Sequence, residues 1–189
     1  MSTPILTTGR LILRPPVAGD AQAIADILNN WDVTQWLTVV PFPYTLADAE
    51  EFLARLFKTE DRNYWLIEEE GEVVGAISLR PDLGFFLAPE AHGKGYMTEA
   101  ARAVLGWHFA KSGEDILSGY HVGNAASARV QEKLGFHKTH EVMHNVVSTG
   151  KEVVVVRTGV HKAVKVRLPL TAPGIFAQIS PRSIKVQLP

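Results

Sequence analysis

Hydrophobic and polar residues alternate along the chain with two spacings, one typical of helices and one typical of strands. In four segments apolar residues recur every three to four positions, which predicts helices. Short runs rich in β-branched and aromatic residues lie between them and predict strands. The helices are expected at about 18–29, 45–58, 96–111 and 124–134, and the strands at about 10–14, 64–69, 73–79, 85–87, 116–121, 137–142 and 153–160. A loop rich in aromatic residues is expected over 31–44, and a hairpin turn over 70–72.

This order of elements predicts an α/β (α+β) domain with a mixed sheet and helices on its faces. A chain of 189 residues with 46% hydrophobic content can bury one sizeable core, and we expect one domain over residues 1–160. Residues 161–189 differ, because from Lys162 onward they hold five Lys or Arg residues, no acid and four prolines. We interpret them as a basic tail that forms either an edge strand or a loosely ordered segment.

Composition narrows the function classes. A net charge of -1 argues against a strongly basic nucleic-acid binder, and the absence of cysteine excludes disulfides, thiolate metal sites and a cysteine nucleophile. No apolar run reaches the roughly 20 residues that span a bilayer, and no basic-then-apolar leader begins the chain. We therefore expect a cytoplasmic enzyme without a membrane partner. No metal is expected either, because His137, His140 and His144 fall in a predicted strand and turn.

The segment from His92 to Arg102 joins a glycine-rich loop directly to a helix start. The first turn of a helix leaves about four N–H groups unpaired and carries about half a positive charge, so it attracts phosphate. Gly93 and Gly95 lack side chains that would keep a pyrophosphate off the backbone, and Lys94 adds a cation. The spacing is neither that of a P-loop nor that of a dinucleotide fingerprint.

A second segment, Asn124 to Phe136, reads as a short helix with Asn124 as its cap and Gly135 as its stop. Together the two segments resemble the GNAT N-acetyltransferases, and the run Thr8-Gly9-Arg10-Leu11-Ile12-Leu13-Arg14 is similar to the branch that acetylates ribosomal-protein amino termini. The resemblance extends from about Thr7 to about Val160. It implies a mostly antiparallel sheet that splays at the cofactor site, acetyl-CoA as co-substrate, and direct attack by an amine in a ternary complex.

The resemblance also implies residue roles on the cofactor side. Backbone N–H groups of Phe86 or Leu87 would face the thioester oxygen, and Ser127 would donate a proton to the leaving thiolate, although Ser127 could instead bond a neighbouring backbone group. Asn124 would contact pantetheine or serve only as a cap, and Lys133 would meet the 3'-phosphate or remain a solvated surface charge. The cofactor loop would consist of His92, Gly93, Lys94, Gly95, Tyr96, Met97 and Thr98. Two of these depart from the family pattern. His92 stands where Gln, Arg or Trp is usual, and Met97 stands where a small residue is usual.

On the acceptor side, Asp82 is placed where relatives often carry a carboxylate, and is expected to bind the amine and accept its proton. Trp31 and Trp36 are expected to line the acceptor pocket, or else to belong to the core. At pH 7 an α-amine with a pKa near 8 is about one-tenth free base, whereas less than about one part in a thousand of a lysine side chain is free base. An α-amine acceptor therefore needs little assistance from a general base.

Three functions remain open from the sequence. The favoured one is an acetyl-CoA-dependent N-acetyltransferase acting on a protein amino terminus, with a small amine or antibiotic as the alternative acceptor and a homodimer as a compatible assembly. The second is a non-catalytic acyl-CoA-binding regulatory module. The third is a ribosome- or RNA-associated protein that uses the basic tail.

Overall fold

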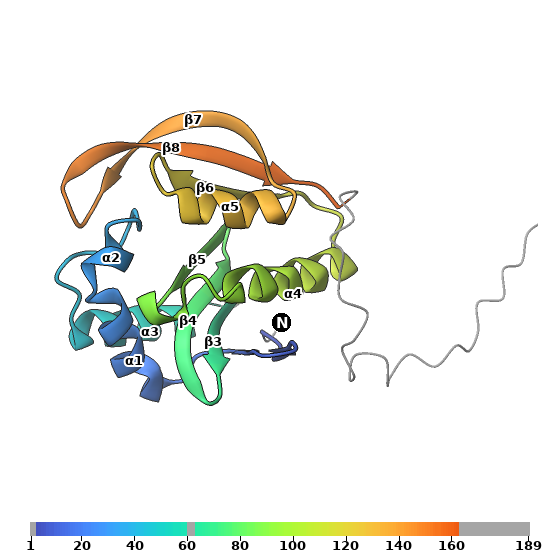
Figure 1. Cartoon of the computed structure of the whole chain (residues 1–189). Coiled ribbons are helices and arrows are strands. Elements are labelled where there is room, and N and C mark those ends of the chain that lie inside the picture. Colours follow the sequence, from blue (N-terminus) through green and yellow to red (C-terminus); the bar gives the residue numbers. More distant parts are fainter. Residues whose placement is uncertain (1–2, 60–62, 163–189) are drawn as a thin grey trace, which may run out of the picture.

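The computed structural model describes residues 3–59 and 63–162, which form one eight-stranded sheet in the order β1-β2-β3-β4-β5-β6-β8-β7 (Figure 1). Every neighbouring pair is antiparallel except β5 and β6, which are parallel. The strands are β1 (Leu6–Thr7), β2 (Ile12–Arg14), β3 (Tyr64–Glu69), β4 (Glu72–Leu79), β5 (Leu83–Leu87), β6 (Ile116–His121), β7 (His137–Val146) and β8 (Lys151–Val160). The predicted mixed, mostly antiparallel α/β fold is confirmed.

Polar side chains mark where several helices begin. Thr45 and Asp48 form a capping box before α3, and the carboxamides of Asn30 and Asn124 accept from N–H groups in the first turns of α2 and α5. The α-helices are α1 (Ala21–Leu28), α2 (Trp31–Thr34), α3 (Leu46–Phe57), α4 (Tyr96–Lys111) and α5 (Ala125–Lys133), and the 3-10 helices are η1 (Ala18–Asp20) and η2 (Pro89–Ala91).

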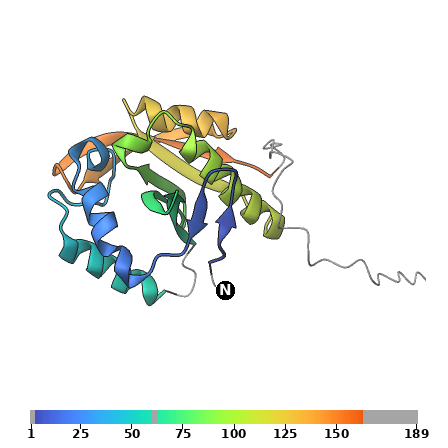
Figure 2. The same cartoon turned by 60° about the horizontal axis from the view of Figure 1, so that its bottom comes forward.

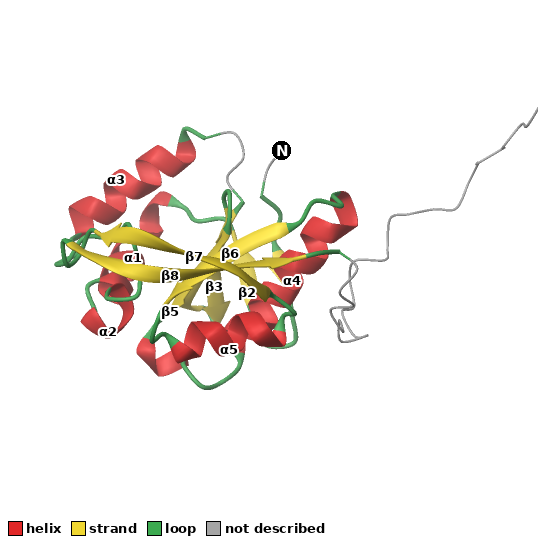
Figure 3. Ribbon diagram, turned by 90° about the horizontal axis from the view of Figure 1, so that it is seen from above, coloured by secondary structure: helices red, strands yellow, loops and turns green. Residues whose placement is uncertain are grey.

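Two hydrophobic cores lie on opposite faces of the sheet, because successive side chains of a strand point to opposite faces. On β3, Trp65 and Ile67 are fully buried in the core that contains α4, while Leu66 is buried in the core that contains α1 and α3. Figure 3 shows α1, α2 and α3 grouped together, with α4 and α5 apart from them. The sheet is therefore covered on both faces, as predicted.

The sheet opens between β5 and β6. These strands pair at one position only, Leu83 with Ser118, and there the Ser118 hydroxyl donates to the Leu83 carbonyl at 2.8 Å. Beyond that point the two halves of the sheet diverge, and Figure 1 shows β6, β7 and β8 forming an upper part separate from β3 and β4. The predicted splay is therefore present.

Most predicted elements are found within a few residues of their expected bounds. Three elements were missed: strand β1, the 3-10 helix η2, and the four-residue helix α2, which replaces the start of the expected aromatic loop. All three are shorter than the window over which a hydrophobic period can be recognised. Residues 163–189 of the predicted tail lie outside the described residues. Across residues 3–59 and 63–162, no helix combines the length and the apolar character that a membrane span requires.

Candidate active site

The glycine-rich loop reaches the start of α4 with its backbone in the left-handed region. Gly93 has φ +76° and Gly95, the N-cap of α4, has φ +82°, which residues with side chains rarely adopt. Gly95 offers no side-chain cap, and the first bond onto its carbonyl comes from the Glu99 N–H at 3.1 Å. The N–H groups of the first turn therefore point outward from a 16-residue helix, as a pyrophosphate site requires.

Side chains of this loop divide between the core and the surface. Tyr96, Met97 and Thr98 are buried, and Met97 belongs to the core packed between the sheet and α4. Its thioether therefore does not cover the backbone donors, despite the departure from the small residue usual at this position. Lys94 is exposed, and its ammonium lies 5.6 Å from the centre of the Tyr96 ring.

The turn between β1 and β2 lies against the loop and the start of α4 and binds both through side chains (Figure 2). The Arg10 guanidinium donates to the Lys94 carbonyl at 3.0 Å and lies 4.6 Å from the centre of the Tyr96 ring. The Thr8 hydroxyl donates to Glu99 at 2.6 Å, and the backbone and side chain of Arg10 donate to the same carboxylate. Burial opposes ionisation of Glu99, but these hydrogen bonds outweigh it and hold its pKa below the ordinary value.

Backbone groups of β5 alternate in direction along the strand. The register with β4 is unbroken from Gly75 opposite Leu87 onward, and the Ala88 N–H donates to the Val74 carbonyl at 2.9 Å. In an antiparallel ladder every second residue turns its N–H and C=O toward the partner strand. Phe86 therefore faces β4, whereas Leu87 turns its polar groups toward the opening before β6.

His92 contacts this opening. Its Nε2 lies 3.1 Å from the Leu87 carbonyl oxygen, and since a carbonyl only accepts, Nε2 carries the proton. Of the two backbone donors expected from the sequence, Leu87 is the one that the ladder directs into the splay. His92, expected to touch the cofactor, thus lies against the end of β5.

Across the opening, α5 presents the second motif. The Asn124 carboxamide oxygen accepts from the Ser127 N–H at 3.0 Å, so Asn124 is a helix cap whose amide NH₂ is directed elsewhere. The Ser127 hydroxyl oxygen accepts from the side chain of Gln131 at 3.2 Å. Lys133 is exposed at the end of the helix.

A cavity of about 710 Å³ lies between β5, β4, α3 and the segment after α2. Its walls are mostly apolar, and its polar groups include Asp82, Asp48 and Tyr44. Burial raises the pKa of Tyr44 to about 12, so its phenol stays neutral at ordinary pH. The apolar lining comes from Leu28, Leu37, Val39, Val40, Pro41, Phe52, Leu56, Ala76, Ile77, Leu83, Phe85 and Phe86.

Asp82 is held by an ion pair at the edge of this cavity. Its Oδ2 accepts from Arg157 of β8 at 2.5 Å, and both side chains are partly buried. The Arg157 Nη1 also lies 3.5 Å from the position that a Cβ on Gly119 would occupy, so the guanidinium passes over β6 to reach β5. The pair joins the two halves of the splayed sheet. The sequence offered no signal for Arg157, because the two residues are 75 positions apart.

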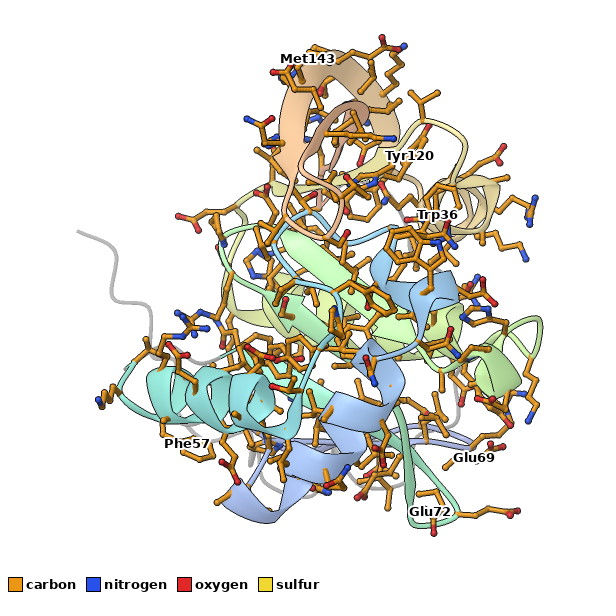
Figure 4. The ribbon with its side chains drawn as sticks, turned by 90° about the vertical axis from the view of Figure 1, so that its left-hand side faces the viewer. Trp36, Phe57, Glu69, Glu72, Tyr120 and Met143 are labelled. Carbon is orange, nitrogen blue, oxygen red and sulfur yellow. The ribbon has the colours of Figure 1, made fainter. Side chains whose placement is uncertain are left out.

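Trp31 and Trp36, expected to line the acceptor pocket or else to belong to the core, are not among the residues that line this cavity. Trp31 is 40% exposed, with its ring edge-on to Phe42 at 5.1 Å. The Trp36 ring lies 3.9 Å from where a Cβ on Gly123 would stand, and Figure 4 labels Trp36 and Tyr120. Trp36 is therefore placed beside the start of α5.

A histidine that the sequence did not single out adjoins the cavity. His121 ends β6 and is buried, and its Nε2 lies 3.0 Å from the hydroxyl of Thr38, which lines the cavity. Burial, with a contribution from nearby His144, lowers the pKa of His121. The neutral imidazole of His121 is thus separated from the cavity by the Thr38 hydroxyl. Among residues 3–59 and 63–162, no three His, Cys, Asp or Glu side chains are grouped as metal ligands.

The fold and this site define an acyltransferase that works from a CoA thioester. A family model described as an acetyltransferase (GNAT) domain matches residues 10–137, so the chain belongs to the GNAT acetyltransferase family. A relative from Bacillus subtilis (strain 168), named as the uncharacterized N-acetyltransferase YoaA, is 28% identical over 149 residues, which cover 71% of this chain and 84% of that protein.

Solved structures share the fold. A ribosomal-protein-S5-alanine acetyltransferase from Vibrio fischeri superposes with a TM-score of 0.71 at 21% identity, covering 86% of this chain and 98% of that chain. The microcin C7 self-immunity acetyltransferase MccE, solved with acetyl-CoA and AMP, gives a TM-score of 0.70 at 13% identity and covers 82% and 93%. The protein is an acetyl-CoA-dependent N-acetyltransferase, which confirms the predicted enzyme class and co-substrate.

The residues present fit acetyl-CoA. The left-handed Gly93 and Gly95 leave the first turn of α4 open to a pyrophosphate. The ladder with β4 turns the Leu87 N–H away from β4, toward the opening that the splay after Leu83 leaves before β6. Bound acetyl-CoA supplies an activated acyl group. The chain then has to hold that group, admit an amine and transfer one proton.

Proposed function

We propose that this protein acetylates the α-amine of a protein or peptide amino terminus by direct attack in a ternary complex. The observation that carries the proposal is the position of the 710 Å³ cavity, which reaches β5 at Phe85 and Phe86, immediately before the Leu87 N–H. An amine held in that cavity approaches the splay from the side opposite the cofactor loop. Leu87 would then donate to the developing oxyanion, a type of contact worth about 3 kcal/mol in other acyl-transfer enzymes.

Proton transfer favours an α-amine as the acceptor. Asp82 is the proposed proton acceptor and borders the cavity, but one of its carboxylate oxygens is already engaged by Arg157. A site with a partly occupied base suits an amine that needs little deprotonation. An α-amine with a pKa near 8 meets that condition, whereas a lysine near 10.4 does not.

Cofactor contacts are proposed for the loop from His92 to Thr98, for Asn124 through its free NH₂, and for Lys133 near the 3'-phosphate. Ser127 is proposed as the proton donor to the leaving thiolate. Trp36 is proposed to border the reacting groups from the α5 side, and Trp31 to contact the acceptor beyond the cavity. A cytoplasmic location and a homodimer remain predictions.

A small primary amine is the second candidate acceptor. Its support is the lining of the cavity, because predominantly apolar walls and a volume of 710 Å³ are typical of small-molecule sites. Such an acceptor would be expected to carry an aromatic or aliphatic body.

CoA release from acetyl-CoA should be measured with peptides beginning Ser, Ala, Thr or Met and with small aromatic and aliphatic amines. The proposal expects kcat/KM for at least one peptide to exceed that of every small amine by about tenfold or more. Higher kcat/KM for a small amine would instead support the second candidate. Peptides blocked by an N-terminal acetyl group provide the control, since they offer no α-amine.

A further inference from the structure

Gln131 is the most deeply buried polar side chain of α5, with 1% of its surface exposed. Its amide makes three hydrogen bonds, of which two connect α5 to β6 and β8 and one lies within α5. Nε2 donates to the Gly119 carbonyl of β6 at 3.1 Å and to the Ser127 hydroxyl oxygen at 3.2 Å, and Oε1 accepts from the Thr158 hydroxyl of β8 at 2.6 Å.

These partners fix which way the amide is turned. Exchanging Oε1 and Nε2 would set Oε1 against the Gly119 carbonyl, and two acceptors cannot share a hydrogen bond. Nε2 therefore faces Gly119 and Ser127, and both of its hydrogens are used. Thr158, itself 3% exposed, donates to the remaining oxygen and holds the amide plane.

The network determines what Ser127 can do with its own proton. A serine in the first turn of a helix commonly donates to a carbonyl three or four residues earlier. Here the hydroxyl oxygen accepts from Gln131, one turn later, and within the described part of the chain the hydroxyl donates to no protein group. The bond from Gln131 occupies a lone pair of the oxygen and leaves its hydrogen available to a bound ligand.

We propose that Gln131 is a positioning residue, which aims the Ser127 hydroxyl at the CoA sulfur by donating to its oxygen. The inference rests on the proposed role of Ser127 in the acetyl transfer. In that reaction the C–N bond forms, the C–S bond breaks with its electron pair on sulfur, and one proton passes overall from nitrogen to sulfur. The oriented hydroxyl donates a hydrogen bond to the sulfur as negative charge develops there.

A double-mutant cycle tests the proposal. Ser127→Ala is expected to lower kcat by about 100-fold, and Gln131→Met by about tenfold, with KM for acetyl-CoA nearly unchanged in both. In the Ser127→Ala background, Gln131→Met should lower kcat no further, because its effect passes through the hydroxyl. A loss of the same size in both backgrounds would overturn the proposal and assign Gln131 a merely structural role.

A binding readout separates this role from lost stability. In complexes with CoA, the pKa of the bound thiol is followed by the ultraviolet absorbance of the thiolate. Both Ser127→Ala and Gln131→Met should raise that pKa above the wild-type value, because a donor to the thiolate is lost or misdirected. Calorimetry should show unchanged CoA affinity when measured below the pKa of the thiol. Thr158→Val, which keeps both Nε2 donors, is the matched control and should shift the pKa less than Gln131→Met.

The outcomes distinguish the two levels of the account. Unchanged kcat and thiol pKa in Ser127→Ala would overturn the role of Ser127, and the role of Gln131 with it. If Ser127→Ala changes kcat and the thiol pKa but Gln131→Met leaves both at their wild-type values, only the role of Gln131 is overturned. The thiol titration needs no acceptor amine, so an incorrect choice of acceptor does not affect it.

Discussion

Arg10 and Glu99 lie 89 positions apart, yet the Arg10 guanidinium donates twice to the Glu99 Oε2, at 2.9 and 2.6 Å. Glu99 lies in the first turn of α4, beside the N–H groups that would receive the pyrophosphate. An unpaired carboxylate there would repel the phosphates, and Arg10 offsets its charge while holding the Lys94 carbonyl at 3.0 Å. The β1–β2 turn thus completes the cofactor loop.

Arg10→Ala is therefore expected to raise the dissociation constant of acetyl-CoA about tenfold, because it releases both the loop and the Glu99 charge. The measurement is calorimetry with acetyl-CoA at two ionic strengths, since the repulsion is screened by salt. Adding Glu99→Gln to Arg10→Ala should restore part of the affinity. If the double variant binds no better than Arg10→Ala, charge repulsion by Glu99 is not part of the loss.

Gly95→Ala tests the left-handed cap of α4. An L-residue at φ +82° costs about 1–2 kcal/mol, and the loop would relieve that strain by moving its N–H groups. Acetyl-CoA affinity should fall about tenfold or more, again by calorimetry. Gly113→Ala is the matched control, because Gly113 lies outside the left-handed region and a Cβ there meets nothing within 4 Å. Equal affinity in the two variants would contradict a backbone site for phosphate at this loop.

The positions of the two glycine-containing motifs could be predicted from the sequence, whereas their long-range contacts could not. The loop from His92 to Gly95 and the helix capped by Asn124 were both located correctly, because caps and glycine stops act within a few residues. Their meeting across the splay followed from the family resemblance. Local rules do not predict which distant segments approach each other, so neither the Thr8 and Arg10 contacts with Glu99 nor the Arg157 ion pair was foreseen.

The direction of an individual side chain depends on structure that lies beyond local sequence rules. Trp31 begins α2 and Trp36 follows it, and neither lines the cavity. Position along an unrecognised helix decides which way an aromatic ring points, and four residues are too few for a period to be recognised. The phase of the β5 ladder, which separates Leu87 from Phe86, equally depends on pairing with β4 and not on sequence.

Asp82→Asn is expected to lower kcat at about pH 7 by roughly 10- to 100-fold if the carboxylate accepts the amine proton. The loss should shrink as pH rises above the pKa of the acceptor amine, because a free amine needs no base. Rate profiles from about pH 6 to pH 9.5 with an α-amine peptide provide the measurement. Arg157→Gln is the control, because it removes the ion pair and keeps the Asp82 carboxylate. Its rate should therefore depend on pH as the wild-type rate does. A loss with Asp82→Asn that is equal at every pH would indicate a structural role instead.

The lowered pKa of His121 is expected to make stability depend on pH. Its pKa is lowered in the folded state by burial and by His144, so below the unfolded value near 6.5 the unfolded chain binds more protons. The free energy of unfolding should thus decrease as pH falls through about 6.5 and stay level above it. Urea unfolding at about pH 7.5 and pH 5.5 should show a larger decrease for wild type than for His121→Asn, which cannot titrate. An equal decrease in both proteins would remove His121 as the cause.

The position of the transferred acetyl group shows whether the acceptor is an α-amine. An alanine-initiated peptide with one internal lysine, incubated with the protein and acetyl-CoA, should gain a single acetyl group, which tandem mass spectrometry assigns to the α-amine. A variant with Gly95→Ala should form this product far more slowly at limiting acetyl-CoA. Acetylation confined to the lysine, or no acetylated peptide while a small amine is acetylated rapidly, would contradict the proposed acceptor.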